Sequence, residues 1–240
     1  MPRLEPHAAR GYNPPITDDE PLKDTPLFGT RAPADFVATA IAFVLAITIH
    51  EFAHAFTATQ LGDPTPRRQG RLTLNPVAHL DPLGTILIFL AGFGWGKPVN
   101  VNPFYLGGTR GMALVAVAGP LSNVLLAIPF ALLFRLNLLP FGGGGGRLLP
   151  SLPELAFTIV FINVLLAVFN LIPLAPLDGS SVLIGLLPSN SGAGVHRIQQ
   201  YGPLILMGLL LIPFVVPGFH PISMIIGPPI NFLLHLLLGR

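Results

Sequence analysis

The chain has 240 residues, of which 51% are hydrophobic and 10% are charged, and its formal net charge is +2. Soluble domains have about 25% charged residues, so this composition excludes an ordinary water-soluble domain and indicates a membrane protein. The small net charge and the lack of a Lys/Arg run argue against nucleic-acid binding. The absence of cysteine excludes a thiolate metal site and a cysteine nucleophile.

The first 33 residues differ in composition from the rest of the chain. They are rich in proline, carry charges of both signs and show no hydrophobic period, which predicts a polar, flexible tail over residues 1–33. We expect a membrane-embedded domain over residues 34–240. The N-terminus lacks the short apolar run of a signal peptide. The first apolar segment is therefore expected to act as an uncleaved membrane anchor.

Five apolar segments are candidate membrane spans. The first, Ala34–Leu61, has about 28 residues and as a helix is about 42 Å long, enough to cross a bilayer with some tilt. The other four are Met112–Leu139, Leu152–Leu171, Leu204–Val216 and Ile222–Leu238. The last two are borderline in length and contain or adjoin proline. The sequence thus predicts an α-helical integral membrane protein with about five transmembrane helices.

The connection between the first two spans, Thr65–Gly111, is rich in Gly, Pro and Asn. It contains a strand-like patch at Arg71–Leu74 and an apolar stretch at Gly84–Phe93 that is too short to cross a bilayer as a helix. Irregular backbone at membrane depth is tolerated only when it is buried in protein or lines a cavity. We therefore expect a re-entrant or strand-like element here. Its five basic residues favour a cytoplasmic position for this loop.

Ionisable residues inside the predicted spans are few, and each is a candidate functional residue because a charge in hydrocarbon is costly. His50 and His54 are one helical turn apart, so both imidazoles can reach one Zn²⁺ from the same helix face. Glu51 is offset by about 100° and can serve as general base toward a water at that metal. A solvent-facing helix can show the same pattern by chance, but an apolar helix offers no such solvation.

A catalytic zinc usually takes three protein ligands, so a third ligand is expected elsewhere in the chain. Asp178 is the candidate, because it follows the third predicted span after a proline-containing stretch. The alternative is that Asp178 only caps the helix that begins at Gly179. The two histidines need a further ligand, which favours the metal role.

The sequence resembles the site-2 protease family of intramembrane metalloproteases over most of Ala34–Leu187. His50–His54 matches the family's H-E-x-x-H motif, and Leu177–Gly179 matches its L-D-G motif. Further segments that look like the family's are Gly70–Pro76 with His79–Thr85, Gly96–Val99 with Asn102–Pro103, and Gly119–Asn123. The sequence departs from the family in having Ala175 where many relatives have proline. It also lacks room for the PDZ or CBS domains found in many members.

The resemblance implies a zinc endopeptidase that cleaves transmembrane or membrane-associated protein segments. It also implies one Zn²⁺ per chain and a prokaryotic cell membrane, with the active site toward the cytoplasm. Asn123 resembles the family's residue that contacts the tetrahedral oxyanion; the alternative is a bridge between helices, which Asn often forms in lipid. Arg71–Leu74 either offers a strand edge to an extended substrate or only shields the site. His79 is expected to hydrogen-bond within its Asn75–Asp81 turn and not to bind metal.

Two other functions are compatible with membrane helices that contain His and Asp. A divalent-metal transporter requires several sites along a path, whereas the sequence offers one compact cluster together with a glutamate. A non-catalytic membrane scaffold normally lacks the glutamate or a ligand, and all of them are present here.

Overall fold

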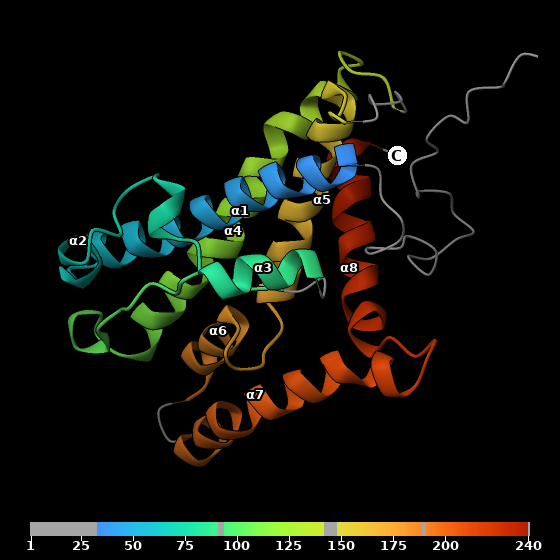
Figure 1. Cartoon of the computed structure of the whole chain (residues 1–240). Helices are drawn as coiled ribbons and strands as arrows, with labels where there is room; N and C mark the ends of the chain where they lie inside the picture. Colours follow the sequence, from blue (N-terminus) through green and yellow to red (C-terminus); the bar gives the residue numbers. More distant parts are fainter. Residues whose placement is uncertain (1–32, 91–93, 142–147, 189–190, 240) are drawn as a thin grey trace, which may run out of the picture.

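A computed structural model describes residues 33–90, 94–141, 148–188 and 191–239, and is drawn in Figure 1. Its α-helices are α1 (Pro33–Gln60), α2 (Thr65–Arg68), α3 (Pro82–Leu90), α4 (Thr109–Arg135), α5 (Leu152–Asn170), α6 (Asp178–Leu186), α7 (Gly192–Val215) and α8 (Pro221–Leu238). Two 3₁₀ turns, η2 (Pro76–Ala78) and η3 (Pro103–Tyr105), lie between α1 and α4. The tail expected over residues 1–33 falls outside the described residues, apart from Pro33.

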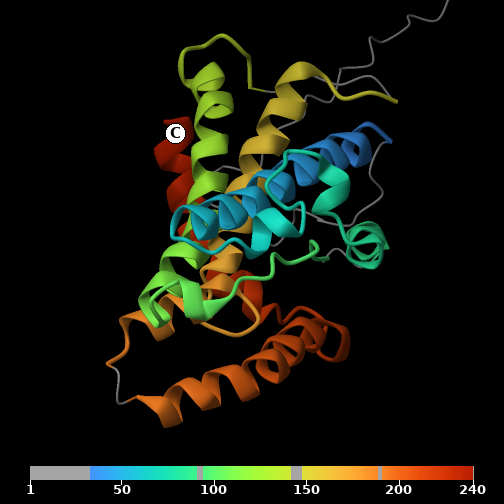
Figure 2. The same cartoon turned by 90° about the vertical axis from the view of Figure 1, so that its left-hand side faces the viewer.

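Four helices, α1, α4, α5 and α8, are long and apolar enough to cross a membrane. This confirms the prediction of an α-helical membrane protein and four of its five spans. The fifth, Leu204–Val216, lies in α7, whose apolar part covers only Gln199–Val215. That stretch is shorter than the roughly 20 residues that a bilayer requires: Arg197 precedes it, and its own first two residues are glutamines. Figures 1 and 2 both show α7 lying across one end of the bundle, where it contacts α6 and α8.

Helix α4 is the centre of the bundle and packs against α1, α5, α6 and α8. Small residues allow this close packing. On α1, four alanines spaced by one turn are almost completely buried: Ala34, Ala38, Ala42 and Ala46. Small side chains let helix backbones approach each other closely, and in lipid such packing is the main source of helix association. The bulkier part of the core, which includes Phe134, Val160 and Ile230, lies among α4, α5 and α8.

The connection between α1 and α4 differs from the expected strand-like structure. Among the described residues there is no β-strand, only an isolated bridge between Leu80 and Gly96. The expectation of a strand-like patch at Arg71–Leu74 is therefore wrong. The patch has no neighbouring strand with which to pair, and Asn75 caps the 3₁₀ turn that follows through a 3.1 Å bond from Val77 N.

The apolar stretch Gly84–Phe93 is helical as far as Leu90, where α3 ends, and residues 91–93 lie outside the description. Helix α3 begins at Pro82 because the side chain of the preceding residue, Asp81, caps it. Asp81 Oδ1 accepts a 2.8 Å hydrogen bond from Gly84 N, as an N-cap residue does. Pro82 occupies the first helical position, where a missing N–H costs nothing. The expectation of a strand-like form is therefore wrong for Gly84–Leu90, which is helical.

Candidate metal centre

Helix α1 brings His50, Glu51 and His54 into the interior of the bundle, where 3%, 7% and 7% of their surfaces are exposed. The two imidazoles lie one turn apart, as the sequence predicted. Their rings meet edge to face, and the two Nε2 atoms are 3.0 Å apart. Both histidines therefore direct the same ring nitrogen at one point.

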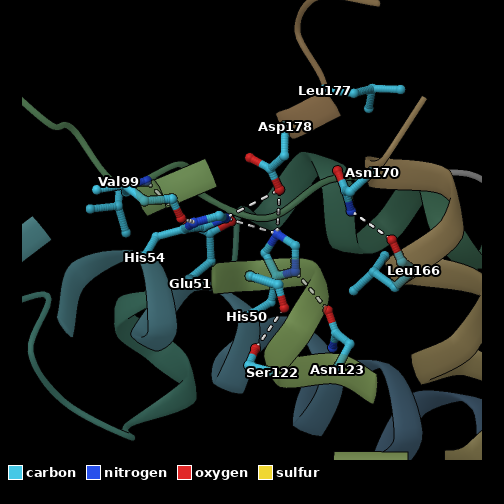
Figure 3. A network of polar contacts seen from close by, with 12 residues as sticks. His50, Glu51, His54, Val99, Ser122, Asn123, Leu166, Asn170, Leu177 and Asp178 are labelled. Carbon is cyan, nitrogen blue, oxygen red and sulfur yellow. Dashed lines mark hydrogen bonds and ion pairs between the residues drawn. The ribbon is translucent and has the colours of Figure 1, made fainter. Parts of the chain in front are cut away.

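Asp178 reaches that point from the first turn of α6 (Figure 3). Its Oδ2 lies 3.1 Å from His50 Nε2 and 3.3 Å from His54 Nε2. The N-cap position of α6 is Leu177, and no side-chain hydrogen bond caps the helix. The contacts of Asp178 are thus with the histidines, and the capping alternative has no support.

A close approach of two backbone segments fixes the position of Asp178. A Cβ atom on Gly179 would lie 2.3 Å from Leu171 O and 2.4 Å from Ile172 O, so only glycine fits beside these carbonyls. The end of α5 therefore packs directly against the start of α6. This packing explains why glycine follows the aspartate in the L-D-G motif.

The hydrogen bonds of the two histidines determine which ring nitrogens carry protons. His54 Nδ1 lies 2.8 Å from Val115 O, and a carbonyl oxygen only accepts, so this nitrogen donates. His50 Nδ1 lies 2.6 Å from Asn123 Oδ1 and donates to it in the same way. In the neutral rings both Nε2 atoms are then lone-pair acceptors, which face each other and a carboxylate oxygen.

This arrangement of acceptors fits a bound cation. Three electron-rich atoms converge without a donor among the described residues, and Asp178 Oδ2 is buried without a hydrogen bond. Zinc bound at about 2.0–2.1 Å from each ligand in a tetrahedron separates the ligand atoms by about 3.3 Å. The observed separations of 3.0, 3.1 and 3.3 Å are close to that value. The donor set of two imidazoles and one carboxylate is also one that zinc prefers.

Gly119 of α4 makes room for the two imidazoles. A Cβ atom at this position would lie 2.5 Å from His54 Nε2 and 2.7 Å from His50 Cε1. The sequence singled out Gly119 only as part of a resembling segment. Its contact with the rings follows from the packing of α4 on α1, which the sequence does not reveal.

Glu51 is next to the three converging side chains but is not one of them. Its Oε2 accepts a 3.0 Å hydrogen bond from Val99 N, and Arg71 Nη2 lies 3.9 Å away. Arg71 is itself buried, and its guanidinium donates to Ala78 O and Lys97 O. A backbone N–H donor and a guanidinium thus fix the position of the carboxylate beside the candidate metal centre.

The segment that supplies Val99 is extended and is held at both ends. Lys97 N donates to His79 O over 2.8 Å, and Asn102 N donates to Asp63 Oδ2 over 2.7 Å. Burial alone would raise the pKa of Asp63, but hydrogen bonds from Thr65 and Asn102 outweigh it and lower the pKa below its usual value. Asp63 therefore anchors the segment as a carboxylate.

His79 is not part of the metal centre. Its Nε2 lies 2.7 Å from Thr73 O, and its side chain is fully buried beside the extended segment. The prediction of a hydrogen bond within the Asn75–Asp81 turn is wrong in its acceptor, because Thr73 lies two residues before that turn.

Asn123 touches the centre through His50, and its own amide group is engaged in the bundle. Its Nδ2 donates to Ala46 O over 3.0 Å and to Asn163 Oδ1 over 2.9 Å. Asn123 thus joins α1, α4 and α5, as the bridging alternative requires. Its role at the oxyanion stays a prediction.

Two further asparagines were missed by reasoning from titratable residues. Asn163 lies behind Asn123, and Asn170 lies beside Asp178 in Figure 3, with its Nδ2 donating to Leu166 O over 3.0 Å. The available signal was the same for both: an amide side chain within the apolar third span.

Comparison with known proteins finds relatives that are named as zinc metalloproteases. "Putative zinc metalloprotease YwhC" of Bacillus subtilis is 40% identical over 179 residues, which cover 72% of this chain and 80% of that protein. "Putative zinc metalloprotease Rip2" of Mycolicibacterium smegmatis is 31% identical over 188 residues, which cover 74% and 68%. Rip2 of Mycobacterium tuberculosis (strain H37Rv) is 32% identical over 184 residues, with the same coverage. No family model and no solved structure matches the chain.

The fold and the converging side chains define a helical membrane protein with a candidate metal centre. Its similarity to these relatives shows that the chain belongs to the site-2 protease family of zinc metalloproteases.

Proposed function

We propose that the chain is a zinc endopeptidase that hydrolyses peptide bonds of transmembrane or membrane-associated protein segments. One Zn²⁺ would be held by His50, His54 and Asp178. The observation that carries this proposal is the convergence of three acceptor atoms, 3.0–3.3 Å apart, among apolar helices. The names of the relatives support zinc and proteolysis.

In this proposal the general base and acid is Glu51. When bound, Zn²⁺ supplies Lewis-acid polarisation of the scissile carbonyl and lowers the pKa of a water. Glu51 takes the proton of the attacking water and transfers it to the leaving amide nitrogen. Val99 N–H orients the carboxylate, and Arg71 places a cation 3.9 Å from it.

The depth of the site supports cleavage within the membrane. Glu51 lies about ten residues before the C-terminal end of α1, which corresponds to about 15 Å along the helix axis. Exposed Arg67 and Arg68 lie in α2, which follows that same end and packs against α1. Basic residues next to spans favour the cytoplasmic side, so we infer that the centre opens toward the cytoplasm of a prokaryotic cell.

For Asn123 the contacts support positioning of His50 in preference to direct contact with the oxyanion. Both of its N–H groups already donate inside the bundle. Donation to an oxyanion would require one of these bonds to break.

Replacement of Glu51 by Gln tests the chemical part of the proposal. The purified protein in detergent is incubated with a panel of single-span membrane proteins that carry a tag at each end. Glu51→Gln should abolish cleavage and retain zinc, because the substitution removes the base and leaves all three ligands. A divalent-metal transporter would instead show zinc flux into proteoliposomes and no cleavage of any panel member. Undiminished cleavage by Glu51→Gln would contradict the assigned role.

A further inference from the structure

A chain of buried polar side chains leads from the metal centre into the middle of the bundle. His50 Nδ1 donates to Asn123 Oδ1 over 2.6 Å, and Asn123 Nδ2 donates to Asn163 Oδ1 over 2.9 Å. The three residues belong to α1, α4 and α5, and both asparagines are fully buried. Polar groups without water must be satisfied by one another, so the order of donors and acceptors in this chain is fixed by its surroundings.

A backbone carbonyl orients Asn163, the member of this hydrogen-bonded series that is farthest from the metal centre. Asn163 Nδ2 donates to Ile159 O over 2.8 Å. A carbonyl accepts and never donates, so the nitrogen of Asn163 must face Ile159. Its oxygen therefore faces Asn123 and can only accept from it.

The same reasoning fixes Asn123. One of its two N–H groups meets Asn163 Oδ1, and the other meets Ala46 O at 3.0 Å. If the amide were flipped, its oxygen would lie 3.0 Å from Ala46 O and 2.9 Å from Asn163 Oδ1, and lone pairs would face lone pairs. Two independent acceptors thus allow one orientation only, and the oxygen of Asn123 faces His50.

An acceptor at Asn123 Oδ1 determines the tautomer of His50. The ring must carry its proton on Nδ1, which leaves the lone pair on Nε2, 3.1 Å from Asp178 Oδ2. A second hydrogen bond of this kind commonly orients a metal-ligating histidine. His54 is oriented in the same way by its hydrogen bond to Val115 O, a backbone group that no side-chain variant removes. Only His50 depends on side chains.

We propose that Asn163 is a positioning residue: through Asn123 it holds His50 in the tautomer and orientation that bind the metal. This inference rests on the proposed zinc site and adds to it a residue on α5 that has no direct contact with the centre. A role confined to joining helices predicts a different outcome. In that case Asn163 contributes to stability alone, and the effects of replacing Asn163 and Asn123 on the unfolding midpoint are additive.

The test measures zinc affinity of the purified full chain by competition with a chelator, together with the thermal unfolding midpoint of the zinc-free protein. The variants are Asn163→Leu, which keeps the volume and removes the acceptor, Asn123→Ala, and the double variant. Val164→Ala is the control, because Val164 is fully buried next to Asn163 in α5 and belongs to the apolar core. It should lower the midpoint and leave zinc affinity unchanged.

Loss of a partner that orients a metal ligand typically weakens metal binding by about 10–100-fold. We expect Asn163→Leu to weaken zinc binding by about 10-fold, near the lower limit, and Asn123→Ala to weaken it at least as much. The double variant should bind zinc no more weakly than Asn123→Ala. Asn163 acts on His50 only through Asn123, so the effects of the two substitutions on zinc affinity are not additive. Asn163→Ser, whose hydroxyl can both accept and donate, should recover part of the affinity and provides a folded variant if Asn163→Leu does not fold.

Several results would overturn the inference. They are unchanged zinc affinity in Asn163→Leu, additive losses in the double variant, or an Asn163→Ser that binds zinc no better than Asn163→Leu. If Asn163→Leu does not fold, zinc affinity of Asn163→Ser equal to that of the wild type would overturn it as well. Failure of the zinc site itself has another signature: a folded wild type that binds no zinc contradicts the proposed function, and this inference falls with it.

Discussion

Gly119 of α4 faces His54 of α1 so closely that a Cβ atom on the glycine would lie 2.5 Å from His54 Cε1 and Nε2. Real Cβ atoms do not approach other atoms so closely, and the imidazole cannot move back without leaving Asp178. The face of α4 is therefore shaped to the histidine pair, and the metal centre depends on a missing side chain as much as on those present.

Gly119→Ala should displace the imidazoles and weaken zinc binding by at least 10-fold, the scale on which loss of ligand orientation acts. Overpacking of this kind also costs about 1–3 kcal/mol of unfolding free energy. Chelator competition and thermal unfolding measure the two effects. Gly208→Ala is the matched control, because a Cβ atom there meets nothing within 4 Å. Equal zinc affinity in the Gly119→Ala and Gly208→Ala variants would refute the packing argument.

Arg71→Met should reduce the rate of peptide cleavage more than it reduces zinc content. The substitution removes the cation that lies 3.9 Å from Glu51 Oε2 and leaves Ala78 O and Lys97 O without their donor. Each buried acceptor left unsatisfied costs about 1–3 kcal/mol, so the unfolding midpoint should also fall. Arg68→Met, on the exposed surface of α2, is the control and should resemble the wild type.

Arg71→Lys distinguishes charge from geometry at the same position. Lysine keeps the charge but cannot form the forked pair of hydrogen bonds. We expect a partial recovery of cleavage and little recovery of stability. Full recovery of both cleavage and stability by lysine would mean that the hydrogen bonds to Ala78 O and Lys97 O are unimportant.

Asp63→Asn should loosen the segment that carries Val99. A carboxylate accepts from Thr65 N at 2.9 Å and from Asn102 N at 2.7 Å through different oxygens, whereas an amide has only one oxygen. The expected loss is about 1–3 kcal/mol of unfolding free energy, with reduced cleavage because Val99 N–H orients Glu51.

This loss should depend on pH. Since the pKa of Asp63 is lowered from 3.8 in the folded protein, its stabilisation is fully present above that value. It disappears as the pH falls through the lower folded pKa. The difference in unfolding midpoint between wild type and Asp63→Asn should therefore be constant at neutral pH and narrow in acid. A difference that widens in acid would contradict the assigned ionisation.

Much of the helical framework could be predicted because apolar length is a local property of sequence. The spans expected at Ala34–Leu61 and Leu152–Leu171 correspond to α1 and α5 within one residue at each end. The span expected at Met112–Leu139 ends earlier, at Arg135. Asn137 adopts a positive φ of 54°, and Arg135 Nη1 turns to Leu236 O at 3.0 Å, at the end of α8. The helix end is thus set by a contact distant in sequence.

The candidate ligands could be singled out from chemistry, because imidazoles and a carboxylate in apolar surroundings need a common partner, and the structure brings these three side chains together. What the sequence could not supply is the geometry between helices. The length of the Gly84–Phe93 stretch does not reveal the helix start at Asp81–Pro82, which depends on the cap that Asp81 provides. Asn163 carries no charge that would mark it in the sequence, although it completes the hydrogen bonds of Asn123. The turn of Arg71 toward Glu51 depends on where the 94–102 segment lies.

The most direct test of the zinc site is the zinc content per chain of detergent-purified protein, with wild type and Asp178→Ala measured side by side. Asp178 supplies one of three ligand atoms, so the account predicts about one zinc per wild-type chain and a clear loss in the variant. The unfolding midpoint of each protein after zinc removal shows that both are folded. A folded wild type without zinc, or a variant with the same content as the wild type, would contradict the three-ligand centre.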